Sequence, residues 1–209
     1  MGEHLLDMER YPRRAQFDYF RTLAYPYVGV TVNVDITDYL SGIKRRGAPS
    51  FLSFCWCAVK AANAVPAFRQ RIRGERIAEY DFCPGSVTLA LPDESYCYCT
   101  LPEAERFEEW LPQAQAAKEA ALSAASLSDG ADGESLLFLS SLPWMSYTAL
   151  VQPVPYPADS NPRISWGKYF TQEGRTLLPV STLCNHALAD AKQLAAFYEE
   201  LERELAALS

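Results

Sequence analysis

The sequence predicts an α+β fold, and three features support that prediction. The stretch from Val28 to Ile36 alternates apolar and polar residues, which is typical of a strand with one buried face. The stretch from Phe51 to Ala64 is apolar on nearly all sides, as expected of a helix inside the core. The second half of the chain holds several short β-rich stretches separated by turn residues. We therefore expect helices packed against a sheet.

The chain opens with a short helix after Tyr11, in which Phe17 and Phe20 are spaced to pack on one side. The residues before this helix, which include His4, are expected to be frayed. The first strand, at 28–36, then follows it.

Beyond that strand, Asp38 or the stretch 47–50 interrupts the chain, and the buried helix then runs as far as Pro66. A short polar segment follows the helix. We expect its arginines to form a solvated face and not an anion site; they are Arg69, Arg71, Arg73 and Arg76.

The middle of the chain predicts a hairpin and a helix. Ser86 to Leu91 and Tyr96 to Leu101 have the composition of paired strands around a turn at 92–94. From 102 to 127 charged residues and alanine dominate, with a narrow aromatic stripe. We expect a long exposed helix there, with a polar exit loop at 128–133.

The second half of the chain predicts mainly strands. The segment 153–162 contains four prolines and is expected to be a rigid surface excursion. A final helix from Asp190 to Leu208 has apolar residues at helical spacing. No internal repeat is found. The predicted strands are Leu136 to Ser141, Met145 to Val151, Ile164 to Phe170 and Thr176 to Cys184.

Composition limits the class of protein. A chain of 209 residues, nearly half of them hydrophobic, suits a single domain over residues 1–209. The 19 Lys and Arg against 26 Asp and Glu give a net charge of -7, which disfavours nucleic acid or an anionic membrane as a partner. No apolar run approaches the roughly 20 residues that span a bilayer, and no secretion signal is recognised, so we expect a cytoplasmic protein.

The cysteines show no metal-binding spacing. No C-x-x-C pair occurs, and the surroundings are largely apolar, so we expect reduced, packed thiols and no metal. Cys97 and Cys99 would share one face of a strand, but no second pair or histidine accompanies them. The six cysteines are Cys55, Cys57, Cys83, Cys97, Cys99 and Cys184.

His186 is the candidate general base. It is one of two histidines, and it lies where a predicted strand gives way to a predicted helix, a place from which a side chain can reach a cleft. A histidine there can equally be a core or capping residue, and the spacing to Asp190 alone is a weak signal.

Four stretches together resemble the chloramphenicol acetyltransferase family, from about Tyr11 to Leu205. The resemblance implies a two-layer α/β sandwich with a mixed, largely antiparallel sheet. It also implies a homotrimer whose active site lies between subunits. The stretches are Tyr11-x-Arg13-Arg14-x-x-Phe17, Ser140-Ser141-Leu142-Pro143-Trp144, Gly167-Lys168-Tyr169 with Glu173-Gly174 and Leu177-Leu178-Pro179, and Asn185-His186-x-x-x-Asp190.

The resemblance implies coenzyme A-dependent O-acetylation of a small hydroxyl acceptor, with acetyl-coenzyme A as the donor. His186 would take the hydroxyl proton, and the Ser140 hydroxyl would donate to the oxyanion. Asp190 would pair with Arg13 to brace the loop. Chloramphenicol is the acceptor that the family implies, and its acetylation would be an antibiotic-resistance activity.

Other positions are implied for binding. Ser165 matches a family threonine thought to hold a water beside the intermediate. Lys168 and Tyr169 match positions that line the coenzyme tunnel. The aromatic segment that contains Phe20 and Tyr25 suits a flat ring in the acceptor pocket.

Two departures from the family pattern leave other functions open. Asn185 replaces a histidine, and Ala191 replaces a glycine whose loss matters if the position needs a positive φ. A ligand-binding homologue without turnover is therefore the alternative. A related acyltransferase acting on a carrier-bound acyl group is a third possibility, which the short chain disfavours.

Overall fold

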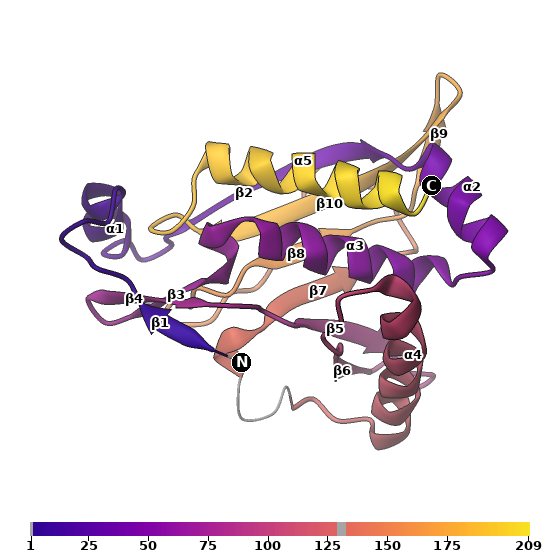
Figure 1. The fold of residues 1–209 in the computed structure, drawn as a ribbon, viewed down its shortest axis with the longest axis horizontal. Coiled ribbons are helices and arrows are strands. Elements are labelled where there is room, and N and C mark those ends of the chain that lie inside the picture. Colours follow the sequence, from indigo (N-terminus) through magenta and orange to yellow (C-terminus); the bar gives the residue numbers. More distant parts are fainter. Residues whose placement is uncertain (1, 129–132) are drawn as a thin grey trace.

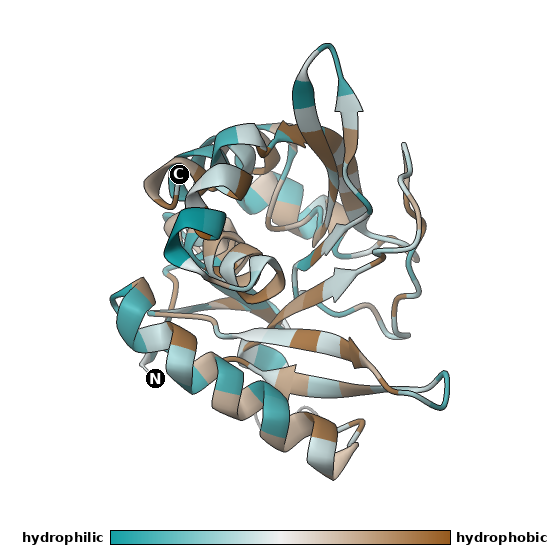
Figure 2. Cartoon of the chain, turned by 90° about the vertical axis from the view of Figure 1, so that its right-hand side faces the viewer, coloured by the Kyte–Doolittle hydropathy of each residue, from teal (hydrophilic) through white to brown (hydrophobic). Residues whose placement is uncertain are grey.

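The structure is a computed structural model that describes residues 2–128 and 133–209. Helices gather on one side of a twisted sheet, so the chain forms two layers (Figures 1 and 2). This arrangement agrees with the predicted fold class. Among the described residues, no helix combines the length and apolar character needed to cross a bilayer.

The main sheet has the strand order β2-β10-β8-β7-β5-β6, and β9 pairs with β10. The pairs β5–β7 and β7–β8 are parallel, whereas the other pairs are antiparallel. The sheet is therefore mixed and largely antiparallel, as predicted. Its strands are β2 (Tyr27–Asp35), β5 (Gly85–Ala90), β6 (Tyr96–Thr100), β7 (Leu137–Ser141), β8 (Arg163–Trp166), β9 (Phe170–Gln172) and β10 (Arg175–Asn185).

Two long helices form the core of the second layer. Helix α3 (Ser50–Ala64) is buried on most sides, as its sequence predicted, and packs beside α5 (Ala191–Ala207). Helix α4 (Phe107–Ala124) covers the hairpin β5–β6, while α1 (Arg14–Phe20) lies at the far end of the molecule (Figure 1). The predicted helix at 102–127 is thus shorter at both ends.

Helix α2 (Thr37–Arg46) was not predicted. It lies between β2 and α3, where the sequence suggested only an interruption. Gly47 ends the helix with a φ of 64°, a conformation that favours glycine. Three basic residues in the last turn face the negative end of the helix dipole, and they are Lys44, Arg45 and Arg46.

A second, smaller sheet corrects two predictions. Its order is β1-β4-β3, formed by β1 (Glu3–Leu5), β4 (Arg76–Tyr80) and β3 (Gln70–Arg73). The residues around His4 are therefore paired in a strand and not frayed. The hairpin β3–β4 was not predicted, because its many charged side chains mask the alternation that indicates a strand.

Arg71 contradicts the expected solvated face, because its side chain is 0% exposed. Its guanidinium donates to backbone oxygens of five residues and contacts the Cys83 sulfur. These carbonyls lie near the 3-10 helices η1 (Pro66–Arg69) and η2 (Gly133–Ser135), and Arg71 supplies them with donors in the core. Asn161 also donates to the oxygens of Glu134 and Leu136. The oxygens belong to Phe68, Gln70, Glu134, Ser135 and Leu136.

Two predicted strands were wrong in part or whole. The stretch 145–151 forms no strand, and its Met145 and Val151 are exposed. The stretch 164–170 is divided, because Gly167–Tyr169 separates β8 from β9. A Cβ at Gly167 would lie 2.8 Å from the Met145 oxygen and from the Tyr147 ring, so this crossing requires glycine. Of the predicted exit loop at 128–133, residues 129–132 lie outside the described part.

The six cysteines are buried, as predicted, and none of them forms a disulfide within the described residues. Within residues 2–128 and 133–209, no group of three or more potential ligands could hold a metal ion.

The two faces of the main sheet differ. Residues such as Val180, Ile164 and Leu139 face the helices and join the core. Their neighbours alternate to the opposite face, which no helix of the described residues covers. There Ser181, Ser165 and Ser140 are aligned across β10, β8 and β7 by strand register, so hydroxyl groups cross this face in a row.

Candidate active site

His186 lies in the turn between β10 and α5. The strand ends at Asn185, and the helix begins at Ala191 with Asp190 as its N-cap. Asp190 accepts a hydrogen bond from the Lys192 amide, and Gln193 accepts one from the Asp190 amide, which completes a capping box. The cap fixes where the helix starts and therefore how long the His186 turn is.

The imidazole of His186 is held on two sides. Its Nδ1 lies 2.8 Å from the backbone oxygen of Ala189, an acceptor, so Nδ1 carries the proton and donates it there. Nε2 is then the basic nitrogen of the neutral ring. Phe20 of α1 stacks on the imidazole with 3.8 Å between ring centroids. The ring thus has one tautomer and a restricted orientation.

Arg13 and Asp190 form an ion pair beside this turn. Arg13 also donates to the backbone oxygen of His186 at 3.3 Å, so one guanidinium links the cap of α5 to the histidine. Burial raises the pKa of Asp190, but the Lys192 amide and Arg13 outweigh it, and the net pKa is lowered. The carboxylate is therefore ionised near neutral pH.

The two departures from the family pattern have ordinary local structures. Asn185 donates to the Asp159 oxygen at 2.9 Å and accepts from the Ala187 amide at 3.1 Å, so its side chain ties down the turn. Ala191 is the first residue of α5 and is not among the described residues with positive φ. The alanine therefore introduces no strain of the kind that glycine relieves.

Sequence reasoning missed a cluster centred on Asp159. Its carboxylate binds Arg163 through two hydrogen bonds, at 2.9 and 2.7 Å, and accepts one from the Tyr27 hydroxyl at 2.9 Å. Burial and the Asp159 charge raise the pKa of Tyr27. Through Asn185, this cluster ties the proline-rich excursion to the His186 turn. No spacing in the sequence indicated the whole cluster, because Tyr27 and Asn185 are remote in the chain from Asp159 and Arg163.

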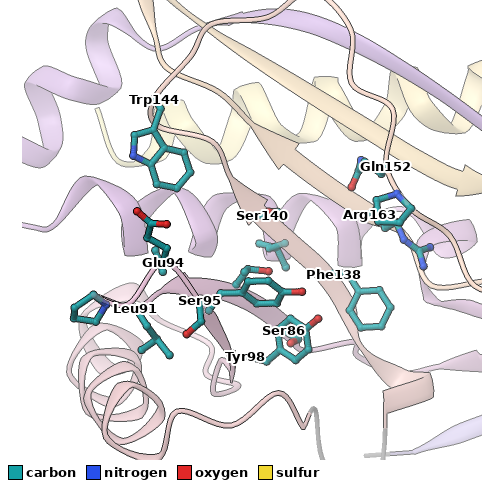
Figure 3. Close-up of a pocket in the computed structure, with 16 residues that line it drawn as sticks. Ser86, Leu91, Glu94, Ser95, Tyr98, Phe138, Ser140, Trp144, Gln152 and Arg163 are labelled. Atoms are coloured by element: carbon teal, nitrogen blue, oxygen red, sulfur yellow. The ribbon is translucent and has the colours of Figure 1, made fainter.

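Ser140 lies in a different place, in a cavity of about 850 Å³ over the helix-free face. The cavity lies between the hairpin β5–β6, the end of β7 and the 142–162 segment (Figure 3). Trp144 and Glu94 both line it (Figure 3). Its other polar lining includes Ser86, Thr88, Tyr98, Gln152 and Arg163.

A single chain does not bring Ser140 and His186 together. Ser140 is aligned with Ser181 through Ser165, and His186 follows Ser181 by five residues. The two side chains are therefore separated by about 16 Å along the strands and about 10 Å across them.

The remaining predicted residues are also dispersed. Ser165 is buried and donates to the Gln152 side chain at 3.2 Å. Lys168 and Tyr169 are exposed between β8 and β9 and do not line the cavity. Tyr25 is exposed near the His186 turn, and its ring lies 5.2 Å from that of Tyr27. The structure thus brings Arg13, Asp190 and Phe20 to His186 and places Tyr25 near the same turn. It leaves Ser140, Ser165, Lys168 and Tyr169 apart.

The chain was compared with known proteins. The sequence model described as chloramphenicol acetyltransferase matches residues 1–202. A chloramphenicol acetyltransferase of Streptomyces acrimycini is 26% identical, over 96% of this chain and 93% of the relative. One from Klebsiella sp is 24% identical, over 97% and 93%.

Solved structures show the same fold. A chloramphenicol acetyltransferase superposes with a TM-score of 0.90 at 23% identity, over 98% of this chain and 100% of that one. A dihydrolipoamide acetyltransferase from Azotobacter vinelandii gives a TM-score of 0.67 at 20% identity, over 92% and 86%.

Proposed function

The chain belongs to the chloramphenicol acetyltransferase family and is an acyltransferase, and from this premise we propose that it acetylates a small hydroxyl acceptor, with acetyl-coenzyme A as the donor. The observation that carries the proposal is the hydrogen bond between His186 Nδ1 and the Ala189 oxygen. It leaves Nε2 as a lone-pair acceptor, which a general base needs.

In the first step, Nε2 of His186 takes the proton of the acceptor hydroxyl while the hydroxyl oxygen attacks the thioester carbonyl carbon. The carbonyl oxygen becomes an oxyanion. The oxyanion then re-forms the C=O double bond as the C–S bond breaks, and the departing coenzyme A sulfur takes the proton from His186. The O-acetyl product and free coenzyme A are formed, and the imidazole returns to its neutral state.

The oxyanion requires a hydrogen-bond donor, and we assign this role to the Ser140 hydroxyl. Because Ser140 and His186 lie far apart within one chain, His186 of one subunit would face Ser140 of its neighbour. The helix-free face of the sheet, which holds Ser140, would then lie towards a second copy. The proposal therefore includes a homotrimer with its active sites between subunits, as the family resemblance implies.

Supporting roles follow from the geometry of the turn. Arg13 and Asp190 position the loop, because their ion pair joins the helix cap to the His186 backbone. Lys168 and Tyr169, exposed beyond β8, are proposed to contact coenzyme A. Ser165, level with Ser140, is proposed to contact the reacting group through water.

The acceptor is proposed to lie between Phe20 and Tyr25 of one subunit and the 850 Å³ cavity of another. The aromatic side chains suit a flat ring, and the hydroxyl-lined wall suits a neutral polar molecule. Chloramphenicol is the first acceptor to examine.

The alternative is a ligand-binding homologue without turnover, motivated by Asn185 and Ala191. The ordinary backbone of Ala191 and the hydrogen bonds of Asn185 favour an intact site instead.

The test measures free thiol released from acetyl-coenzyme A with chloramphenicol and a panel of other alcohols. The wild type should release thiol in an acceptor-dependent way, and His186→Ala should lower kcat by at least about 1,000-fold. Calorimetric binding of an acceptor without any product would support the inactive alternative.

A further inference from the structure

Gln152 is a polar residue of the cavity that the proposed chemistry does not use. It belongs to the irregular segment between β7 and β8 and lines the same cavity as Ser140 (Figure 3). Its side chain is half-buried. Sequence reasoning did not select it, because it lies between the predicted strand at 145–151 and the proline-rich excursion at 153–162.

The Gln152 carboxamide has a defined orientation. Ser165 is 1% exposed, and its hydroxyl donates to Gln152 Oε1 at 3.2 Å. A buried hydroxyl proton needs an acceptor. Within residues 2–128 and 133–209, the acceptor of the Ser165 hydroxyl is Gln152 Oε1. The amide oxygen of Gln152 is thus occupied by the hydrogen bond from Ser165 of β8. The nitrogen, on the other branch of the carboxamide, keeps two N–H donors.

Neighbouring polar groups of the cavity are already engaged. The Ser95 hydroxyl donates to Asp93, and the Arg163 guanidinium is paired with Asp159. Arg163 therefore offers no uncompensated charge for an anionic acceptor. Gln152 differs from both, since its fixed orientation leaves its nitrogen with no recorded partner in the described part of the chain.

We propose that Gln152 determines acceptor specificity by donating from Nε2 to an oxygen of the acceptor other than the reacting hydroxyl. The substrate class is then a neutral alcohol that also carries a carbonyl, nitro or ether oxygen. This inference rests on the proposed function. Ser165, which orients Gln152, is the register partner of Ser140, so the second contact lies within a small molecule's length of the reacting centre.

The variant Gln152→Glu tests this directly, because it keeps an oxygen for Ser165 and removes both N–H donors. With the best acceptor of the panel, the acceptor KM should rise about 10-fold, while kcat and the KM for acetyl-coenzyme A stay within about twofold. Gln152→Leu removes the same donors and also the acceptor of Ser165, so it should raise the acceptor KM at least as much and lower kcat in addition. The control Gln115→Glu, on the exposed face of α4, should leave every constant unchanged.

Analogues of that acceptor identify the contact. An analogue that lacks the oxygen in question should bind the wild type about 10-fold more weakly and lose its sensitivity to Gln152→Glu. An unchanged acceptor KM in both Gln152 variants, with an active wild type, would overturn the inference alone. An equal rise in KM for every acceptor, including simple alcohols without a second oxygen, would also overturn the inference. A wild type that acetylates nothing would overturn the proposed function as well.

Discussion

The ring of Phe20 lies over the imidazole of His186, with 3.8 Å between the centroids and 22° between the planes. Phe20 belongs to α1, which is remote in sequence from the turn that holds His186. Helix α1 therefore restricts the orientation of the imidazole on one side. The carbonyl of Ala189 fixes the ring from its edge, and Phe20 fixes it from its face.

Replacing Phe20 by leucine should lower kcat about 10-fold, because the imidazole loses the flat surface that keeps its plane in one orientation. The KM for acetyl-coenzyme A should change little. Steady-state kinetics would measure both constants. Leu23→Ala, an exposed change in the same segment, is the matched control and should be neutral. An unchanged kcat in Phe20→Leu would show that the stacking does not aim the ring.

Asp190 has two separable roles, as a helix cap and as the partner of Arg13. Asparagine caps a helix as well as aspartate does, so Asp190→Asn should keep the stability of α5 while losing the ion pair. We expect kcat/KM to fall about 10-fold. Asp190→Ala should in addition lower the free energy of unfolding by about 1 kcal/mol, as measured in urea.

Arg13→Gln provides the partner for a double-mutant cycle with Asp190→Asn. If the two residues act as a unit on the His186 loop, the double variant should be no less active than the worse single variant. Strictly multiplicative losses in kcat/KM would contradict the idea that the pair positions the loop.

A shared active site predicts complementation between two inactive variants. His186→Ala and Ser140→Ala should each be nearly inactive alone. After the two are unfolded, mixed in equal amounts and refolded, about a quarter of the interfaces should combine an intact His186 with an intact Ser140. Thiol release should return to a corresponding fraction of the wild-type rate. No recovery in mixed oligomers, verified by mass, would argue against a site between subunits.

Acid should weaken the contact between Glu134 and the hairpin β3–β4. The hydrogen bond from Arg73 lowers the pKa of Glu134 below its ordinary value of 4.5. The contribution of Glu134 to stability is therefore complete above pH 4.5 and is lost as the pH falls through the folded-state pKa. In urea titrations, the free energy of unfolding should fall less steeply below that pH in Glu134→Gln than in the wild type. Glu199→Gln, at an exposed position of α5, should follow the wild type.

Elements with a clear period could be predicted from the sequence. The alternating valines gave β2, the continuous apolar run gave α3, and the apolar spacing after Asp190 gave α5. The residues of such an element determine its structure largely by themselves. Helix α2 could also have been found, since Gly47 and the basic last turn are ordinary signals of a helix end.

Other features depend on tertiary structure. Arg71 reads as a surface residue in sequence, yet carbonyls from distant segments surround it. The stretch 145–151 has a β-rich composition but pairs with no strand, and Met145, Ala149 and Val151 remain exposed. Composition alone cannot separate a strand from an irregular apolar segment.

The residues of the candidate site also divide into those that local sequence indicates and those that only the tertiary structure shows. The place of His186 at a strand–helix junction made it a candidate, and the resemblance to a known family added the role of Asp190, because both lie in one short motif. Asp159 and Gln152 could not be selected, since they matter only through residues that the fold brings to them. Register alone revealed that Ser140 and His186 belong to different ends of the sheet.

The sheet leaves one of its faces without a layer of helices. The imidazole is anchored from the N-terminal helix and the start of α5, whereas the cavity wall is built from the hairpin turn and the irregular segment after β7. Substitutions in those loops can therefore change which molecules fit the cavity, while the contacts that hold His186 stay as they are. A chain organised in this way can acquire a new substrate by loop variation alone, without rebuilding its core.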